Sequence, residues 1–275
     1  QIAERRNKRI EAERAEALRK KNEPKQEVQE EEQAEKIIRM PESAEPKKDY
    51  VFVPSLGLYL SENRYLQDKD WNQTQKILHK EGRRMPTIPE FVELLKYLRS
   101  KDGKSKLKNA EKILDEIYTV RGPYRAEWLD AKFEEKNGMY VAYHTFDSKG
   151  SIVQKSDELE EYLTEDKIPG INLEFWLDDS TKQGLPEPKV AKGDLYYWYP
   201  RDGAVARFDA YSVRAYLYCY RNPDIRNAGL GVRYVEPIAM GEDRAKNAKS
   251  QFSKFIDRIT RDPKIEEMKR QGFKI

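Results

Sequence analysis

Residues 71–91, WNQTQKILHKEGRRMPTIPEF, predict two consecutive helices and the turn between them. The apolar residues of the first half recur at helical spacing, and Gly82 stands where a helix C-terminus favours glycine. Thr87 suits the N-cap of the second helix, because Glu90 three residues later completes a capping box and Pro89 fits the first turn. The buried face of the second helix is expected to consist of Phe91, Leu94, Leu95 and Leu98.

Short aromatic and β-branched segments around these helices predict strands, and a third amphipathic helix is expected at residues 107–118. The predicted strands are residues 50–53, 57–60, 127–130, 139–146 and 173–177, and residues 195–199 open a terminal aromatic region. Two polar stretches, 147–170 with one short helix and 180–193, have the composition of surface insertions. Helices and strands in this order predict an α+β fold.

The two ends of the chain differ in composition from this middle part. Residues 1–48 carry 13 Lys or Arg and 12 Asp or Glu, which predicts a charged helical or disordered segment. An oligomerising or virion-docking helix is the alternative for this segment. Residues 239–275 predict a charged C-terminal helical extension, so residues 49–238 are expected to form the folded domain.

The bulk properties of the 275-residue chain weigh against several classes of partner. A net charge of +3 gives no strong attraction to nucleic acid or to a membrane surface. No apolar run approaches the roughly 20 residues of a membrane-spanning helix, so we expect no membrane insertion. No signal peptide is visible, but the chain starts at Gln1 without a methionine, which leaves a preceding leader open. Both a cytoplasmic and a virion- or cell-surface-associated location stay open, as does the oligomeric state.

Residues 207–234, RFDAYSVRAYLYCYRNPDIRNAGLGVRY, bear most directly on function. Three tyrosines at alternate positions, from Tyr216 to Tyr220, are separated by Leu217 and Cys219. This is the period of a strand with tyrosines on one face and smaller apolar residues facing the core. Tyrosine combines a large contact area with a hydroxyl group and loses little entropy on binding, which favours a binding surface.

Two other interpretations of these tyrosines stay open. They would line a second core if the polar insertions cover them. They also resemble a stacking platform for single-stranded nucleic acid, because arginines flank them. Those arginines are Arg214, Arg221, Arg226 and Arg233. The excess of basic over acidic residues in this window is small, which weakens the nucleic-acid interpretation.

Two stretches resemble a known fold family. Residues 71–91 resemble the W-x-x-A and G-x-R-x-P-T-x-x-E run of C-type lectin-fold proteins of the formylglycine-generating branch. The segment Gly231-Val-Arg-Tyr resembles the strand that closes that fold. The resemblance covers about residues 50–237 and implies a C-type lectin fold with polar insertions, preceded here by the charged N-terminal segment.

Within that fold, residues 207–233 resemble the variable region of a diversity-generating retroelement protein, most closely the archaeal and archaeal-virus variable proteins. In that family, adenines of a template copy are mutated, so that asparagine codons come to encode other residues. The positions reachable in this way, which the resemblance makes a surface for a protein or glycan ligand, are Tyr211, Val213, Tyr216, Tyr218, Tyr220, Asn222, Ile225, Asn227 and Gly229. The invariant scaffold between them would be Phe208, Ala210, Ala215, Leu217, Cys219, Pro223, Ala228, Leu230, Gly231 and Val232.

The alternatives to a binding protein are an enzyme of the formylglycine-generating type and a single-stranded nucleic-acid binder. The enzyme family uses a cysteine pair, whereas Cys219 is the one cysteine here and is expected to be a buried structural thiol. His79 and His144 have no second ligand at metal or triad spacing. Asp178 and Asp179 faintly resemble a lectin calcium site, but the partner loop is missing, because residues 187–189 lack its amide. We therefore expect no catalytic residue, no metal and no cofactor.

Overall fold

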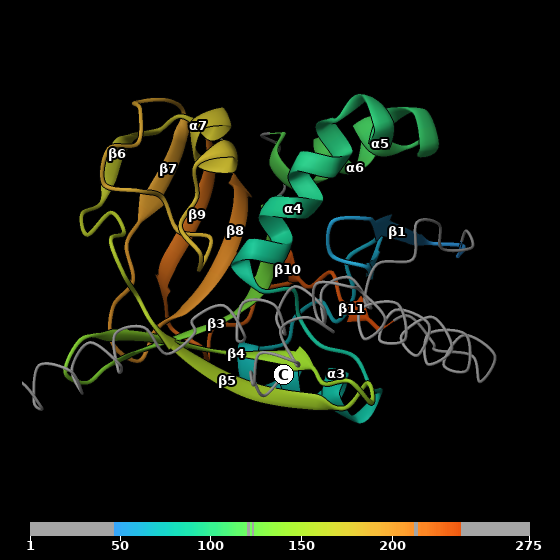
Figure 1. Cartoon of the computed structure of the whole chain (residues 1–275), viewed down its shortest axis with the longest axis horizontal. Coiled ribbons are helices and arrows are strands. Elements are labelled where there is room, and N and C mark those ends of the chain that lie inside the picture. Colours follow the sequence, from blue (N-terminus) through green and yellow to red (C-terminus); the bar gives the residue numbers. More distant parts are fainter. Residues whose placement is uncertain (1–46, 120–121, 123, 212–213, 238–275) are drawn as a thin grey trace, which may run out of the picture. The chain divides into compact units, whose positions relative to one another are not determined.

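The computed structural model describes residues 47–119, 122, 124–211 and 214–237, so the expectations for residues 1–46, Val213 and residues 238–275 lie outside the described residues. The described residues belong to one compact unit that spans residues 42–240. This unit mixes helices and strands, which confirms the α+β class (Figure 1). No helix of the described part is long and apolar enough to cross a membrane.

Two sheets form the scaffold. The smaller sheet is antiparallel with the order β1-β2-β11, and its strands are β1 (Tyr50–Val53), β2 (Leu58–Ser61) and β11 (Val235–Glu236). The larger sheet has the order β5-β4-β3-β8-β9-β7-β6, with β10 paired to β3. Its strands are β3 (Arg125–Glu135), β4 (Met139–Phe146), β5 (Ile152–Glu158), β6 (Lys167–Ile171), β7 (Leu195–Trp198), β8 (Val205–Tyr211), β9 (Arg214–Arg221) and β10 (Leu230–Gly231).

One helix organises the main core between the sheets. The helices are α3 (Trp71–Lys80), α4 (Ile88–Arg99), α5 (Lys101–Lys106), α6 (Ala110–Tyr118) and α7 (Leu173–Asp178). Helix α4 contacts β1 of the smaller sheet and β3 of the larger one, and it also packs on α6 and α7 (Figure 1). Phe91 of α4 and Trp176 of α7 both lie against Phe208 of β8, at ring separations of 5.1 and 6.3 Å.

The turn between α3 and α4 explains the spacing of the motif in residues 71–91. Gly82 ends α3 with a φ of 69°, a left-handed conformation that glycine adopts easily. Thr87 and Glu90 form the predicted capping box at the start of α4. Arg84 is buried, and both of its terminal nitrogens donate to the Glu90 carboxylate. The glycine, arginine, threonine and glutamate of the motif therefore belong to one connected structure.

The strand predicted at residues 173–177 is wrong, because this segment forms α7. The side chain of Asn172 caps the helix by accepting a hydrogen bond of 2.9 Å from the amide of Phe175. Trp176 and Leu177 face the core three and four residues after the first helical residue, which is helical spacing. A short apolar run fits either a strand or a helix, and here the N-cap at Asn172 favours the helix.

The short helix predicted within residues 147–170 is also wrong, since β5 and β6 occupy this stretch. Strand β5 pairs with β4 along its whole length and stands at one end of the larger sheet. Its polar residues suit an edge strand, whose faces stay largely in solvent. Neither polar stretch is only a surface insertion, because Leu163 and Leu185 are buried in the main core.

The observed bounds of several other elements differ from the predicted ones. The strands predicted at 50–53 and 139–146 are confirmed, whereas β3 extends well beyond the predicted residues 127–130. The third predicted helix begins at Ala110, and α5 precedes it as an unpredicted short helix. Ser100 caps α5 by accepting a hydrogen bond from the amide of Gly103.

Candidate binding surface

The outer face of β9 carries the predicted tyrosines. Leu217 and Cys219 are completely buried, whereas Tyr220 is 43% exposed and Tyr216 and Tyr218 are half-buried. Burial raises the pKa of the Cys219 thiol above its ordinary value, so the thiol stays protonated at neutral pH. The predicted division of this strand between core and surface is confirmed, and so is the burial of the cysteine.

Strand β7 lies beside β9 (Figure 1), and its residues Leu195–Trp198 add further aromatic side chains. The two strands pair in parallel, with Tyr196 opposite Tyr216 and Trp198 opposite Tyr218. The rings of Trp198 and Tyr218 stack at 4.6 Å with an interplanar angle of 14°. Tyr218 and Tyr220 stack more loosely, at 6.4 Å and 19°. We call Tyr196, Trp198, Tyr216, Tyr218 and Tyr220 the aromatic ladder.

A second, smaller core lies between α3 and the larger sheet. Trp71 of α3 packs there with Trp128 of β3 and Val205 of β8. The Trp71 indole also donates a hydrogen bond of 2.9 Å to the carbonyl oxygen of Leu129, which fixes α3 on the sheet. Tyr211, at the end of β8, is 51% exposed. The tyrosines of β8 and β9 are therefore open to solvent at both Tyr211 and Tyr220, which is not the environment of an enclosed second core.

Two arginines lie over the outer rings of the ladder. The Arg201 guanidinium is 4.0 Å from the ring centre of Tyr220, and it also pairs with Asp166 at 2.9 Å. The Arg214 guanidinium is 5.6 Å from the ring centre of Tyr196. Such cation–π contacts stabilise by about 0.5–1 kcal/mol at exposed sites, and they also hold the rings in place.

A buried ion pair on β8 lies beside the tyrosines of β9, with Arg207 opposite Tyr218 and Asp209 opposite Tyr216. Arg207 and Asp209, both on β8 and both buried, pair at 2.7 Å. Burial raises the pKa of the Asp209 carboxyl to about 6, and the guanidiniums of Arg207 and Arg221 oppose this effect. These two guanidiniums also lie 5.5 and 5.1 Å from the ring centre of Tyr218. Two cations thus act on a single carboxylate beside the stacked rings.

Asparagine side chains shape the turns of the loop that follows β9. The side-chain oxygen of Asn222 accepts a hydrogen bond of 2.8 Å from the amide of Asp224. That of Asn227 accepts a hydrogen bond of the same length from the amide of Gly229. Such asparagine turns form locally and need no partner from another element.

Residues outside the loop hold its main chain. The carbonyl oxygen of Pro223 accepts a hydrogen bond of 2.9 Å from the amide of Trp71, and that of Leu230 accepts one of 3.2 Å from the amide of Asp68. The guanidinium of Arg64 donates to the carbonyl oxygen of Gly229. All three hydrogen bonds end on backbone atoms of the loop or of β10.

The structure sorts the predicted positions of residues 207–233 into two environments. Of the nine predicted surface positions, the exposed ones are Tyr211, Tyr220, Asn222 and Asn227, the half-buried ones are Tyr216, Tyr218, Ile225 and Gly229, and Val213 lies outside the described residues. The predicted scaffold positions are buried at Phe208, Ala210, Leu217, Cys219, Leu230, Gly231 and Val232, half-buried at Ala215 and Pro223, and exposed at Ala228. None of the described surface positions is buried, and seven of the ten scaffold positions are; Ala215, Pro223 and Ala228 are the exceptions.

Gly229 does not fit the role of a freely variable position. A Cβ atom there would overlap the backbone carbonyl of Tyr124. We expect Gly229→Ala to lower the free energy of unfolding by about 1–3 kcal/mol, because the backbone would have to move. Gly122→Ala is the control, since a Cβ there meets nothing within 4 Å and its effect should stay within about 0.5 kcal/mol. If the two variants had equal denaturation midpoints, Gly229 would tolerate a side chain and could be a variable position after all.

The surface extends beyond residues 207–234 to side chains that the sequence does not predict to lie there. Tyr196, Trp198 and Arg201 belong to it through the pairing of β7 with β9, and Tyr124 through its ring contact with Tyr211 at 5.7 Å. The signal available was the alternation of Leu195 and Tyr197 with Tyr196 and Trp198. That pattern predicts two faces but not which strand lies alongside.

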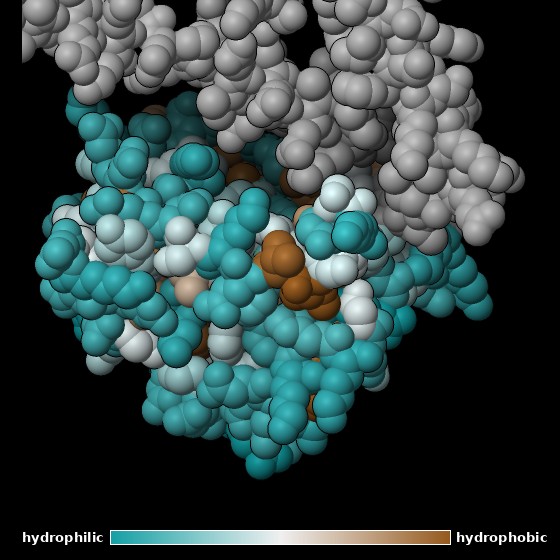
Figure 2. Space-filling view, turned by 60° about the horizontal axis from the view of Figure 1, so that its bottom comes forward, coloured by the Kyte–Doolittle hydropathy of each residue, from teal (hydrophilic) through white to brown (hydrophobic). Residues whose placement is uncertain are grey.

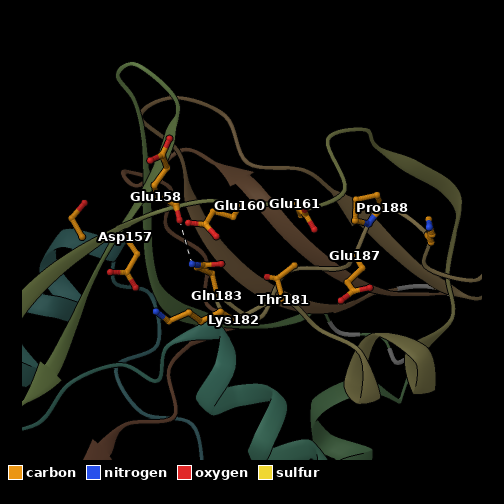
Figure 3. A pocket seen from close by; sticks show the side chains of 11 residues that line it. Asp157, Glu158, Glu160, Glu161, Thr181, Lys182, Gln183, Glu187 and Pro188 are labelled. Carbon is orange, nitrogen blue, oxygen red and sulfur yellow. Dashed lines mark hydrogen bonds between the residues drawn. The ribbon is translucent and has the colours of Figure 1, made fainter. Parts of the chain in front are cut away.

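An acidic depression lies elsewhere on the domain, where β5 meets the segment after α7. Five carboxylates line it with two lysines; they are Asp157, Glu158, Glu160, Glu161, Glu187, Lys182 and Lys189. Gln183 donates a hydrogen bond of 3.2 Å to the carbonyl oxygen of Glu158 and so ties the two segments together (Figure 3). Figure 2 shows a further face on which hydrophilic residues dominate and the strongly apolar area is small. Neither feature resembles the aromatic ladder.

The two histidines meet inside the domain rather than standing alone. The rings of His79 on α3 and His144 on β4 are 4.6 Å apart. Asp130, fully buried on β3, accepts hydrogen bonds from the backbone amide of His144 at 3.0 Å and from the side chain of Gln75 at 2.7 Å. Among the residues that the structure describes, no group of three or more His, Cys, Asp or Glu side chains could hold a metal ion.

This histidine pair predicts an acid-sensitive contribution to stability. Burial lowers the pKa of His79 below its ordinary value, and the neighbouring His144 and Arg84 act in the same direction. The unfolded chain therefore takes up this proton first, and the contribution is present above about pH 6.5 and is lost as the pH falls below that value. We expect His79→Gln to reduce the loss of Tm between about pH 7.5 and pH 5.5.

The comparison with the unsubstituted protein isolates this effect. Asp130 and Asp209, whose pKa values are raised by burial, stabilise the fold on acidification and so act in the opposite direction. Both carboxyls are present in both proteins, so they cancel in the difference. The same pH dependence of Tm with and without His79 would contradict the assignment.

No family model, curated protein or solved structure matches the chain. The geometry of its own residues therefore carries the functional argument.

Proposed function

We propose that this chain is a ligand-binding protein with a C-type lectin fold, whose surface around β9 and the following loop is diversified by a retroelement. The observation that carries the proposal is the division of residues 207–233. Positions reachable from asparagine codons are exposed or half-buried wherever the structure describes them, and most of the positions between them are buried. A site that tolerates many sequences needs this separation of surface and core.

The composition of the surface suits binding rather than catalysis. The aromatic ladder and its arginines are the residue types that contribute most to protein interfaces. Cys219 is completely buried and its thiol pKa is raised, which disfavours the cysteine oxidation of formylglycine-generating enzymes. We therefore propose a protein or glycan as ligand, with no catalytic residue in this site.

The proposal is tested by randomising the exposed positions. Libraries are built at Tyr211, Tyr216, Tyr218, Tyr220, Asn222 and Asn227, and a matched control library at Phe208, Leu217, Leu230 and Val232. We expect the first library to stay largely folded and to yield variants that bind different targets, and the control library to unfold. Loss of folding in the first library would contradict the proposal.

The DNA beside the gene gives an independent test. We expect a near-copy of the codons for residues 207–233 that differs only at adenines, close to a reverse-transcriptase gene. A flanking region with neither feature would contradict diversification by a retroelement, while leaving the binding role to the library experiment.

A further inference from the structure

Neighbouring side chains lie over ring faces of Trp198, Tyr218 and Tyr220 in the aromatic ladder. Trp198 stacks on Tyr218 at 4.6 Å, Tyr218 lies nearly parallel to Tyr220, and the Arg201 guanidinium lies 4.0 Å from the ring centre of Tyr220. A nucleic-acid base binds an aromatic residue by stacking on an open ring face. Here a neighbouring side chain occupies a face of each of these rings. The ring edges and the phenol hydroxyls are what such a stack offers to a ligand.

The centre of the surface carries more positive than negative charge. Arg207 and Arg221 share the single carboxylate of Asp209, whose pKa reflects both guanidiniums. Arg207 is buried and Arg221 is half-buried, so Arg221 is the one of the two that a partner can reach. A guanidinium stacked on a ring keeps its N–H edge for a carboxylate, which it can bind with two parallel hydrogen bonds.

We propose that this surface binds a protein partner through an acidic segment. Carboxylates of the partner pair with Arg221 and with Arg201 at the edge of the ladder, and the hydroxyls of Tyr216, Tyr218 and Tyr220 donate hydrogen bonds to it. The inference rests on the proposed binding function and narrows its ligand from protein or glycan to an acidic protein segment. Tyrosine and arginine together are the residues most enriched at the energetic centres of such interfaces.

The experiment compares labelled probes on the full chain at low ionic strength, where charge contacts are screened least. The probes are a polyglutamate peptide, a polylysine peptide of equal length, an oligothymidylate and a neutral oligosaccharide. We expect polyglutamate to bind most tightly. Arg221→Gln should weaken its binding about tenfold, and Lys104→Gln, which removes the same charge from the exposed helix α5, should leave it within about twofold.

A tyrosine-to-phenylalanine variant separates recognition by hydroxyls from recognition by ring faces. Replacing Tyr216, Tyr218 and Tyr220 together by phenylalanine keeps every ring and removes three hydroxyls. We expect this variant to stay folded by circular dichroism and to lose most of its affinity for polyglutamate. Unchanged affinity, or tighter binding of oligothymidylate or the oligosaccharide than of polyglutamate, would overturn the inference. Either outcome leaves the proposed binding function standing if the randomised library still yields folded binders.

Discussion

Leu217→Ala is expected to lower the free energy of unfolding by about 2–5 kcal/mol, because it removes a completely buried side chain from the main core. Tyr220→Ala, three positions further along the same strand, is expected to cost less than about 1 kcal/mol, since its side chain is 43% exposed. Urea denaturation followed by tryptophan fluorescence measures both values. The contrast tests which face of β9 belongs to the core.

The order of the two effects matters more than their size. If Tyr220→Ala proved as destabilising as Leu217→Ala, the tyrosines would be part of a core and the surface would lose its role as a binding site. Tyr218→Ala should fall between the two, because its ring is half-buried between Trp198 and Tyr220.

Glu90→Ala is expected to lower the free energy of unfolding by about 3–5 kcal/mol. The substitution leaves the buried guanidinium of Arg84 without the carboxylate that accepts from both of its terminal nitrogens. It also removes half of the capping box that begins α4, the helix between the two sheets. Thermal unfolding monitored by circular dichroism measures the loss.

A matched control separates the buried pair from an ordinary surface charge. Glu111 on α6 pairs with Lys104, but its side chain is 79% exposed. Glu111→Ala should therefore change stability by less than about 1 kcal/mol. Equal Tm values for Glu90→Ala and Glu111→Ala would show that Arg84 finds another partner and that the motif does not hold the turn together.

Local sequence signals predicted the parts of the fold that depend on a few neighbouring residues. The capping box of α4, the glycine after α3 and the alternation along β9 each arise within one element. The short segment of α7 was misread as a strand because its apolar run fits either period. Strands β5 and β6 were missed because edge strands keep polar side chains and owe their structure to backbone pairing with β4 and β7.

The binding surface was predictable only in part for the same reason. The pattern in residues 207–234 predicts the exposed tyrosines of this surface. The aromatic ladder also includes residues of β7, which is separated from its partner β9 in sequence by β8. The excess positive charge arises because two guanidiniums, of Arg207 and Arg221, act on the one buried carboxylate of Asp209. No local sequence pattern predicts how deeply that carboxylate is buried. Likewise, His79 and His144 are distant in sequence and become neighbours only when α3 packs on the sheet.

The loop after β9 is fastened through its main chain. Its partners are the amides of Trp71 and Asp68 and the guanidinium of Arg64, and next to it Val232 and Tyr65 exchange two backbone hydrogen bonds. Every amino acid except proline supplies the same amide and carbonyl groups. Under the proposed function, replacing Asn222 or Asn227 removes one local side-chain hydrogen bond but none of the hydrogen bonds that tie the backbone of the loop to Arg64, Asp68 and Trp71. A surface of the proposed kind changes its specificity while these backbone attachments of the loop stay the same.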